Sequence, residues 1–157
     1  MKAEYINPFL NAAKNVIQTM ARIEVKGSKP QLKTGNTTFG KITGIIGMAS
    51  AKISGNMIIS FQEACILNIV GSMLMEPVKP NIDNDVVDAV GELTNMICGG
   101  AKAELSKIGH AFDLATPTMI VGENIEMTSY SDAPTIVIPL STAHGDFVIE
   151  ANFSEHR

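Results

Sequence analysis

The stretch from Asn84 to Gly109, NDVVDAVGELTNMICGGAKAELSKIG, is the longest segment of this chain with a helical apolar period. Its apolar residues recur at offsets of three and four, which places them on one side of a helix. The members of this side are Val86, Val90, Leu93, Ile97, Ala101, Leu105 and Ile108. We therefore expect an amphipathic helix whose apolar side packs on a core, with Asn84 or Asp85 capping its first turn.

The opposite side of the same helix is polar and ends in glycine. Asp88, Glu92, Asn95 and Gly99, called the ridge below, follow one another at offsets of four, three and four, which return to one helical face. Carboxylates near a helix N-terminus interact favourably with the helix dipole, so a plain solvated face is one interpretation. Gly99 and Gly100, however, each cost a helix interior about 1 kcal/mol relative to alanine. The amide and the glycine favour a second interpretation, a surface that a partner approaches closely.

The composition is that of a globular protein of single-domain size. The chain has 157 residues, of which 45% are hydrophobic and 18% are charged. A chain of this length buries most of the surface that its unfolded form exposes, so we expect one domain over residues 1–157. The net charge of −4 argues against nucleic acid as a partner, because proteins that bind phosphate backbones carry a basic stripe.

The first residues, MKAEYINPFLNAAKN, hold a proline and polar side chains where a secretory signal has its apolar core. No apolar run reaches the length of about 18 residues that a membrane-spanning helix needs. We therefore expect a cytoplasmic protein that does not bind a membrane. In that compartment Cys65 and Cys98 are expected to be buried, reduced thiols rather than a disulfide.

Familiar motifs for metals, nucleotides and covalent catalysis are missing from the sequence. His110, His144 and His156 share no spacing typical of a metal site, and there is no CxxC pair. The patterns GxSxG, GxxxxGK[ST] and GxGxxG are also absent. We therefore expect this chain to bind no metal and no cofactor of its own.

Segments before the long helix predict two more helices and a hairpin. Helical apolar spacing predicts the helices at about 2–22 and 62–75. Between them, short β-favouring runs predict strands at 42–49 and 57–61, joined by a turn through Ser54-Gly55-Asn56.

Glycine and proline over residues 23–40 predict irregular or short edge-strand structure. After the long helix the apolar period changes to two, with Gly145-Asp146 as the clearest turn. The strands predicted there lie near 117–122, 126–130, 135–140 and 147–153. Helices and hairpins that are segregated in this way predict an α+β fold, an antiparallel sheet packed with long helices.

The pattern Asp88-x-x-x-Glu92-x-x-Asn95, followed by Pro117, resembles the signature of the CheC/CheX/FliY family of chemotaxis phosphatases. A single such helix in a chain this short is most similar to the CheX branch of that family. The resemblance covers nearly the whole chain, since the family's layout also has an opening helix, a glycine-rich hairpin, a second helix and late hairpins. It implies one CheX-like phosphatase domain over residues 1–157.

The resemblance also implies an activity, the dephosphorylation of the phospho-aspartate of a CheY-type response regulator. By this analogy Asn95 orients the attacking water and Glu92 pairs with the regulator's active-site lysine. Asp88 either orients the neighbourhood of Glu92 or contacts the regulator, and Gly99 lets the regulator's loops come close. Mg²⁺ is expected in the regulator and not in this chain. CheX relatives form homodimers with a sheet continued across the interface, and the strand predicted at 135–140 offers an apolar edge for such pairing.

Two other functions stay open at this point. A binding module related to flagellar-switch components would bind the phosphorylated regulator without hydrolysing it, and a dimeric scaffold would hold another signalling protein. The presence of both Glu92 and Asn95 favours the enzyme, because a pure binding module has no use for an amide that orients water.

Overall fold

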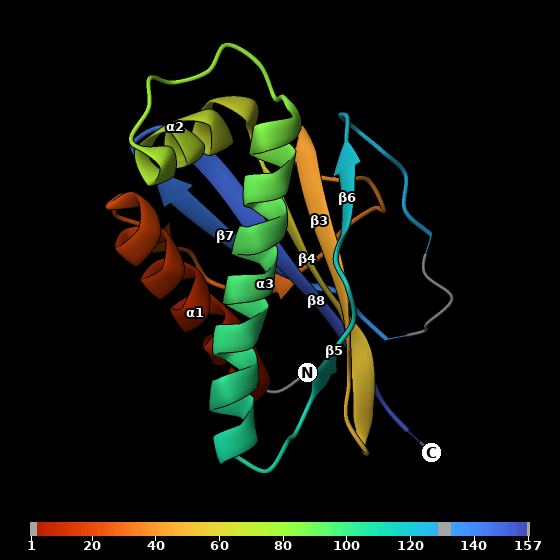
Figure 1. The fold of residues 1–157 in the computed structure, drawn as a ribbon. Coiled ribbons are helices and arrows are strands. Elements are labelled where there is room, and N and C mark those ends of the chain that lie inside the picture. Colours follow the sequence, from red (N-terminus) through yellow and green to blue (C-terminus); the bar gives the residue numbers. More distant parts are fainter. Residues whose placement is uncertain (1–2, 129–132, 157) are drawn as a thin grey trace.

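Three helices lie on one face of an antiparallel β-sheet (Figure 1). The computed structural model describes residues 3–128 and 133–156. In chain order the elements are α1 (Ala3–Ala21), β1 (Lys26–Gly27), β2 (Gln31–Leu32), β3 (Ile42–Ala49), β4 (Ile53–Phe61), α2 (Glu63–Leu74), α3 (Asn84–Lys107), β5 (Asp113–Leu114), β6 (Thr118–Val121), β7 (Ile136–Thr142) and β8 (Gly145–Glu155). All three predicted helices are confirmed, and their ends differ from the prediction by no more than two residues.

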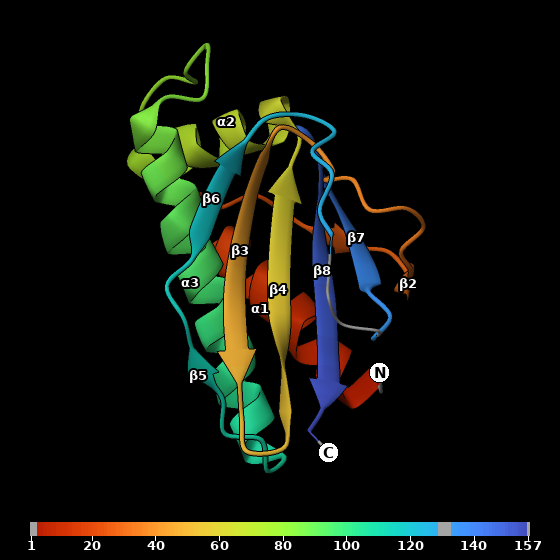
Figure 2. The same ribbon diagram turned by 90° about the vertical axis from the view of Figure 1, so that its right-hand side faces the viewer.

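Among the described residues, the sheet has eight strands in the order β1-β7-β8-β4-β3-β5, with β2 also paired to β7 and β6 also paired to β3. Every one of these pairs is antiparallel. Figure 2 shows the sheet from its open side, with the helices behind it. The predicted α+β class is therefore confirmed. Of the helices that the structure describes, none combines the length and the apolar character needed to cross a membrane.

The apolar side of α3 lies in the centre of the core. Its first six predicted members, from Val86 to Leu105, are no more than 1% exposed. Ile108 was predicted to belong to this side, but it is 47% exposed, because α3 ends at Lys107 and Ile108 leaves the helical repeat. Across the core, the rings of Phe61 and Phe147 stack with their centroids 4.9 Å apart.

The start of α3 is capped by Asp83 and not by the predicted Asn84 or Asp85. The Asp83 carboxylate accepts a hydrogen bond from the Val86 backbone N–H at 3.0 Å. Lys79 Nζ lies 2.8 Å from the Asp83 carboxylate and 3.0 Å from that of Asp85. The hydrogen bond from Lys79, together with that from Val86, lowers the pKa of Asp83. Asp83, Asn84 and Asp85 are all of types that cap helices well, and Asp83 is the one whose extended backbone stands just before the first helical residue.

The turn of the β3–β4 hairpin lies at residues 50–52, earlier than the predicted turn at Ser54-Gly55-Asn56. Ser50 Oγ accepts a hydrogen bond from the Ile53 backbone N–H at 3.0 Å, which closes the turn. The predicted turn residues belong to β4. A Cβ on Gly55 would lie 1.8 Å from the carbonyl oxygen of Asn152 on β8. This glycine therefore reflects the close approach of two strands.

Three of the four strands predicted after α3 are confirmed as β6, β7 and β8. The strand predicted at 126–130 is wrong over its described part, where Glu126 forms only an isolated bridge with Thr37; residues 129 and 130 lie outside the described residues. Gly145 and Asp146 belong to β8, and the turn lies just before them at 143–144. Gly145 has a φ of 131°, so the glycine serves the exit from the turn.

β7 does not offer the free edge that was predicted at 135–140. The backbone N–H groups of Ser28 and Lys33 donate to the carbonyl oxygens of Pro139 and Thr135, each at 2.9 Å. The short strands β1 and β2 also pair with β7. That prediction is wrong because the segment between α1 and β3 covers this edge.

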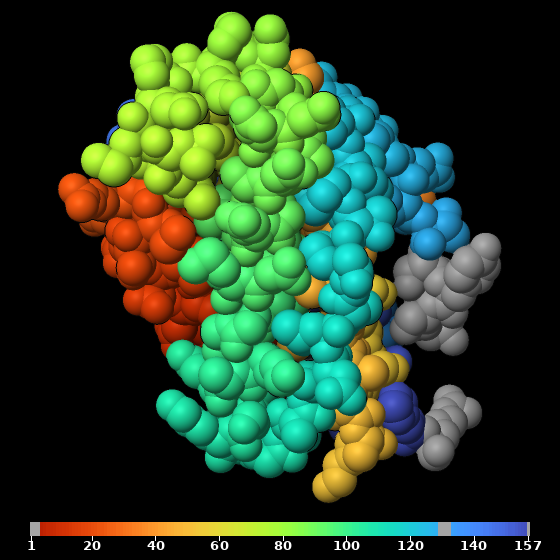
Figure 3. Space-filling view, in the orientation of Figure 1, coloured from red at the N-terminus to blue at the C-terminus, as the bar shows by residue number. Residues whose placement is uncertain are grey.

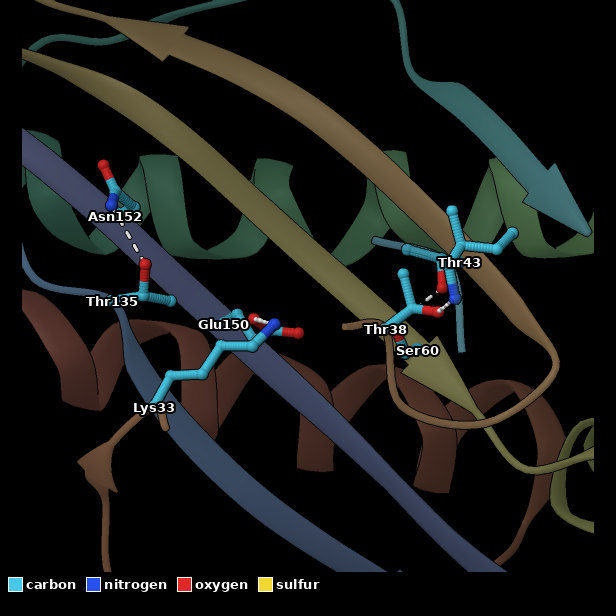
Figure 4. A network of polar contacts seen from close by, with 8 residues as sticks. Lys33, Thr38, Thr43, Ser60, Thr135, Glu150 and Asn152 are labelled. Carbon is cyan, nitrogen blue, oxygen red and sulfur yellow. Dashed lines mark hydrogen bonds and ion pairs between the residues drawn. The ribbon is translucent and has the colours of Figure 1, made fainter. Parts of the chain in front are cut away.

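The open face of the sheet carries polar contacts that are satisfied within the chain (Figure 4). Lys33 Nζ lies 2.6 Å from Glu150, with the two side chains 16% and 3% exposed. Two further contacts join Asn152 to Thr135 at 3.0 Å and Thr43 to Ser60 at 2.8 Å. Each of these side chains therefore already has a partner within the described chain.

Candidate functional site

The four ridge residues lie together on the outward face of α3. Asp88, Glu92 and Asn95 are exposed, and Gly99 is half-buried. Figure 3 shows α3 running along the surface between α1 and the β5–β6 segment, with its outer side uncovered. The predicted polar face is therefore present, and it is a surface rather than a cleft.

The polar side chains of the ridge have no partner within the described part of the chain. There, Asp88, Glu92 and Asn95 make neither a hydrogen bond nor an ion pair through their side chains. In contrast, Glu150 on the open face is buried and its carboxylate is paired with the half-buried Lys33. The ridge thus presents two carboxylates and an amide that another molecule can engage.

The inner face of the same helical turns is buried and fixes the ridge in place. Val90, Leu93, Thr94 and Ile97 are all 0% exposed. Thr94 Oγ1 donates to the carbonyl oxygen of Val90 at 2.7 Å, so its hydroxyl is satisfied within the helix. Close-packed interiors allow little displacement, and a site on a packed helix is held more accurately than one on a loop.

β6 lies beside the ridge and contacts α3 through Met119. A Cβ on Gly91 would lie 3.9 Å from Met119 Sδ, which is ordinary van der Waals contact. Pro117 is half-buried and directly precedes β6. Pro117 therefore belongs to the approach to this neighbouring strand and not to the ridge itself.

Glu92 and Asn95 together can hold a cation and a water molecule side by side. Side chains three residues apart on a helix have Cβ atoms about 5 to 6 Å apart. The Glu92 carboxylate is an acceptor that pairs with cations, whereas the Asn95 amide accepts through its oxygen and donates through its nitrogen. Neither group is a strong nucleophile, so the pair is suited to orienting a reacting group and not to attacking a substrate itself.

The remaining reactive side chains do not add a nucleophile. Cys65 and Cys98 are both 0% exposed, which confirms their predicted burial as free thiols. Burial raises the pKa of the Cys65 thiol to about 11 and that of Cys98 to about 12. Since the thiolate is the reactive form, neither cysteine attacks a substrate near neutral pH. Within the described residues, no group of three or more His, Cys, Asp or Glu side chains is arranged to hold a metal ion.

Sequence reasoning did not identify the residues that support the ridge from below. Thr94 is buried against Gly44 of β3, where a Cβ on Gly44 would lie 2.5 Å from Thr94 Oγ1. Two signals were present in the sequence: a threonine that interrupts the apolar side of the helix, and a glycine within a strand that is rich in β-branched residues. Neither signal says that the two residues meet.

The family model for the chemotaxis phosphatase CheX matches residues 42–141, which is more than half of the chain and includes the whole ridge. The chain therefore belongs to the CheX family of chemotaxis phosphatases. This confirms the family that the ridge pattern predicted and places the chain among phosphatases, which are hydrolases.

Solved structures that resemble this chain extend over nearly its full length. A CheC-like superfamily protein from Shewanella sp. PV-4 is 44% identical, with a TM-score of 0.91 over 98% of this chain and 99% of that one. In the CheX–CheY–BeF₃–Mg²⁺ complex from Borrelia burgdorferi, the matching chain is 27% identical, with a TM-score of 0.78 over 98% of both chains. The CheY-P phosphatase CheX of Thermotoga maritima is 26% identical over 130 residues, 83% of each chain.

Proposed function

We propose that this protein hydrolyses the phospho-aspartate of a CheY-type response regulator, with the ridge of α3 as its catalytic surface. One observation carries the proposal: in a member of the CheX family, Glu92 and Asn95 are exposed on the outer face of a helix whose inner face is buried, and their side chains have no partner among the described residues. A surface of this kind suits a substrate that is itself a folded protein.

The Borrelia burgdorferi complex supports the choice of partner, since it joins CheX to CheY with BeF₃ and Mg²⁺. BeF₃ stands in for a phosphoryl group, so that complex represents a phosphorylated regulator. In the proposal, the regulator brings both the phosphoryl group and the Mg²⁺. This chain brings the residues that complete the site from outside.

In the proposed reaction, a water molecule attacks the phosphorus and the bond between phosphorus and the aspartyl oxygen breaks. The aspartate leaves as a carboxylate, and the phosphate product keeps both hydrogens of the water. Such a transfer passes through a loose transition state, which needs an aligned water more than a strong base. Asn95 supplies that alignment, because its amide oxygen accepts from the water while its nitrogen donates to a neighbouring oxygen.

Glu92 pairs with the lysine of the regulator's active site and thereby fixes the register of the two proteins. Its carboxylate lies about one helical turn from Asn95, so the lysine and the water occupy neighbouring positions. A charge pair that is desolvated in an interface contributes to orientation as well as to affinity.

Asp88 and Gly99 are proposed to contact the regulator at the two ends of the ridge. Asp88 is exposed one turn before Glu92. A Cβ on Gly99 would meet nothing within 4 Å in the described structure, so the chain's own packing does not require this glycine. In the proposal, Gly99 instead lets the regulator's loops approach the backbone of α3 closely.

We further propose that the protein works in the cytoplasm as a homodimer that pairs through a sheet edge. Among the described strands, β6 pairs only with β3, which leaves its other side open for a second copy. Light scattering in solution gives the molar mass, and a monomer at micromolar concentration would contradict this part of the proposal.

The deciding assay compares phosphate release from a panel of phosphorylated regulators, with catalytic amounts of wild type, Glu92→Ala and Asn95→Ala. The proposal expects wild type to accelerate release from at least one regulator and both variants to lose the effect. A binding module would instead protect the phosphoryl group, and a scaffold would leave its lifetime unchanged.

A further inference from the structure

The turn of α3 that carries Glu92 and Asn95 is in unusually close contact with the sheet. A Cβ built on Gly44 of β3 would lie 2.5 Å from Thr94 Oγ1, closer than real Cβ atoms approach a neighbour. The same Cβ would lie 3.2 Å from Met119 Cε on β6 and 3.4 Å from Ile59 Cγ2 on β4. Only a residue without a side chain lets the helix come this near at this point of β3.

Thr94 cannot give way easily at this contact. Its side chain is 0% exposed, and its Oγ1 donates to the Val90 carbonyl oxygen at 2.7 Å. A β-branched side chain has few χ1 rotamers in a helix, and rotation away from Gly44 would leave the hydroxyl without this bond. Extra bulk at residue 44 must therefore push the helix backbone rather than a flexible side-chain end.

The contact lies directly under the ridge. Thr94 sits between Glu92 and Asn95 in sequence and points inward while they point outward. Beside it, Met119 fills the space between Gly44 and Gly91, the residue that precedes Glu92. Helix α3 and strands β3 and β6 thus contact one another at the helical turn that carries Glu92 and Asn95.

We propose that Gly44 and Thr94 are positioning residues that set how far Asn95 projects from the sheet. The inference rests on the proposed phosphatase function, and it adds a pair of residues that touches neither the regulator nor the water. Asn95 has a short side chain, so a shift of its backbone moves the attacking water out of line. Glu92 and a lysine are longer, and their rotamers absorb the same shift.

This asymmetry predicts a change in kcat more than in KM. Gly44→Ala needs the helix to move outward by somewhat less than about 1 Å, and a misplacement of that size costs on the order of 100-fold in rate. We expect kcat for phosphate release to fall between about 10- and 100-fold, with KM within about threefold of wild type.

Four further variants separate positioning from general damage. Gly47→Ala is the matched control on the same strand, because its Cβ would lie 3.6 Å from Ala115, an ordinary contact. Thr94→Ser keeps the hydroxyl and should retain wild-type kcat. Thr94→Ala combined with Gly44→Ala removes the clashing oxygen, so the double variant should recover kcat to near that of Thr94→Ala alone.

The experiment measures kcat, KM and the thermal unfolding midpoint for all of these variants in one phosphate-release assay. Loss of kcat in Gly44→Ala with recovery in the double variant supports the inference. A folded Gly44→Ala with wild-type kcat overturns it. Should Gly44→Ala not fold, Thr94→Val decides: reduced kcat relative to Thr94→Ser supports the inference, and equal kcat overturns it. Wild type that fails to release phosphate contradicts the proposed function instead.

Discussion

Gly100 of α3 lies against Ala12 of α1, and a Cβ on Gly100 would come within 3.1 Å of Ala12 Cβ. The neighbouring Gly99 faces open space, with nothing within 4 Å of its Cβ position. The two adjacent glycines of α3 therefore have different surroundings and different structural roles. Gly100 allows two helices to pack closely, whereas Gly99 has no such reason in the described structure.

These environments predict different effects of alanine on stability. Gly99→Ala should raise the free energy of unfolding by about 0.5 to 1 kcal/mol, because alanine is the better helix former and meets no obstacle. Gly100→Ala should gain less or lose stability, since α1 must move by a few tenths of an ångström. Chemical denaturation of both variants measures the difference, and equal gains would contradict the assigned roles.

A longer side chain at Gly99 tests the proposed approach of the regulator. Gly99→Gln should not lower the unfolding midpoint, because the side chain enters open space and glutamine is a better helix former than glycine. It should raise KM for phosphate release by about tenfold, the equivalent of about 1.4 kcal/mol of lost binding. Thr19→Gln on the exposed side of α1 is the control, and an unchanged KM at residue 99 would exclude that contact.

Removal of the Asp83 cap should weaken the start of α3. Asp83→Ala loses the bonds to Val86 and Lys79, and we expect the unfolding midpoint at pH 7 to fall by about 2 to 4 °C. Asp83→Asn, which keeps a capping oxygen, should fall less.

The pH dependence of this effect follows from the lowered pKa of Asp83, whose first cause is the hydrogen bond from Lys79. A carboxylate with a lowered pKa in the folded state stabilises the fold above its unfolded pKa, and the effect is lost as pH falls through the folded value. The difference between wild type and Asp83→Ala should therefore shrink below about pH 4. A difference that grows on acidification would contradict the assignment.

The two buried thiols should be silent in the native protein. Their pKa values of about 11 and about 12 leave almost no thiolate at pH 8. A thiol reagent should therefore label neither Cys65 nor Cys98 until the chain is unfolded, when both react. Because burial raises both values above 9.0, the fold should also lose stability above about pH 9. Rapid labelling of the folded protein would show that one of these sites opens.

Helical periodicity predicted the core side of α3 because a helix with one buried side has apolar residues at regular intervals of three and four in its sequence. The same spacing wrongly assigned Ile108 to the core side, because the helix has already ended there. Caps and turns were less predictable. Asp83, Asn84 and Asp85 are all suitable caps, and only the point at which the extended backbone enters the helix distinguishes them.

The turn predicted at Ser54-Gly55-Asn56 was wrong because Gly55 has another role. Glycine next to serine and asparagine is typical of a turn, yet here the glycine makes room for the carbonyl of Asn152 almost a hundred residues later. The prediction of a free edge at β7 was wrong for a similar reason, since the segment that covers this edge carries no strong strand pattern of its own. At the site, sequence placed the ridge on one face but could not show the Gly44–Thr94 contact beneath it, because that contact joins two elements.

The measurement that tests the central claim most directly is phosphate release from a phosphorylated CheY-type regulator with Asn95→Ala. Asn95→Ala should lose about 100-fold or more in kcat, because the water is no longer aligned. It should still bind the BeF₃-treated regulator within a few-fold of wild type, and Asn15→Ala on the exposed side of α1 should behave as wild type. Hydrolysis by Asn95→Ala at a rate close to that of wild type would contradict the account.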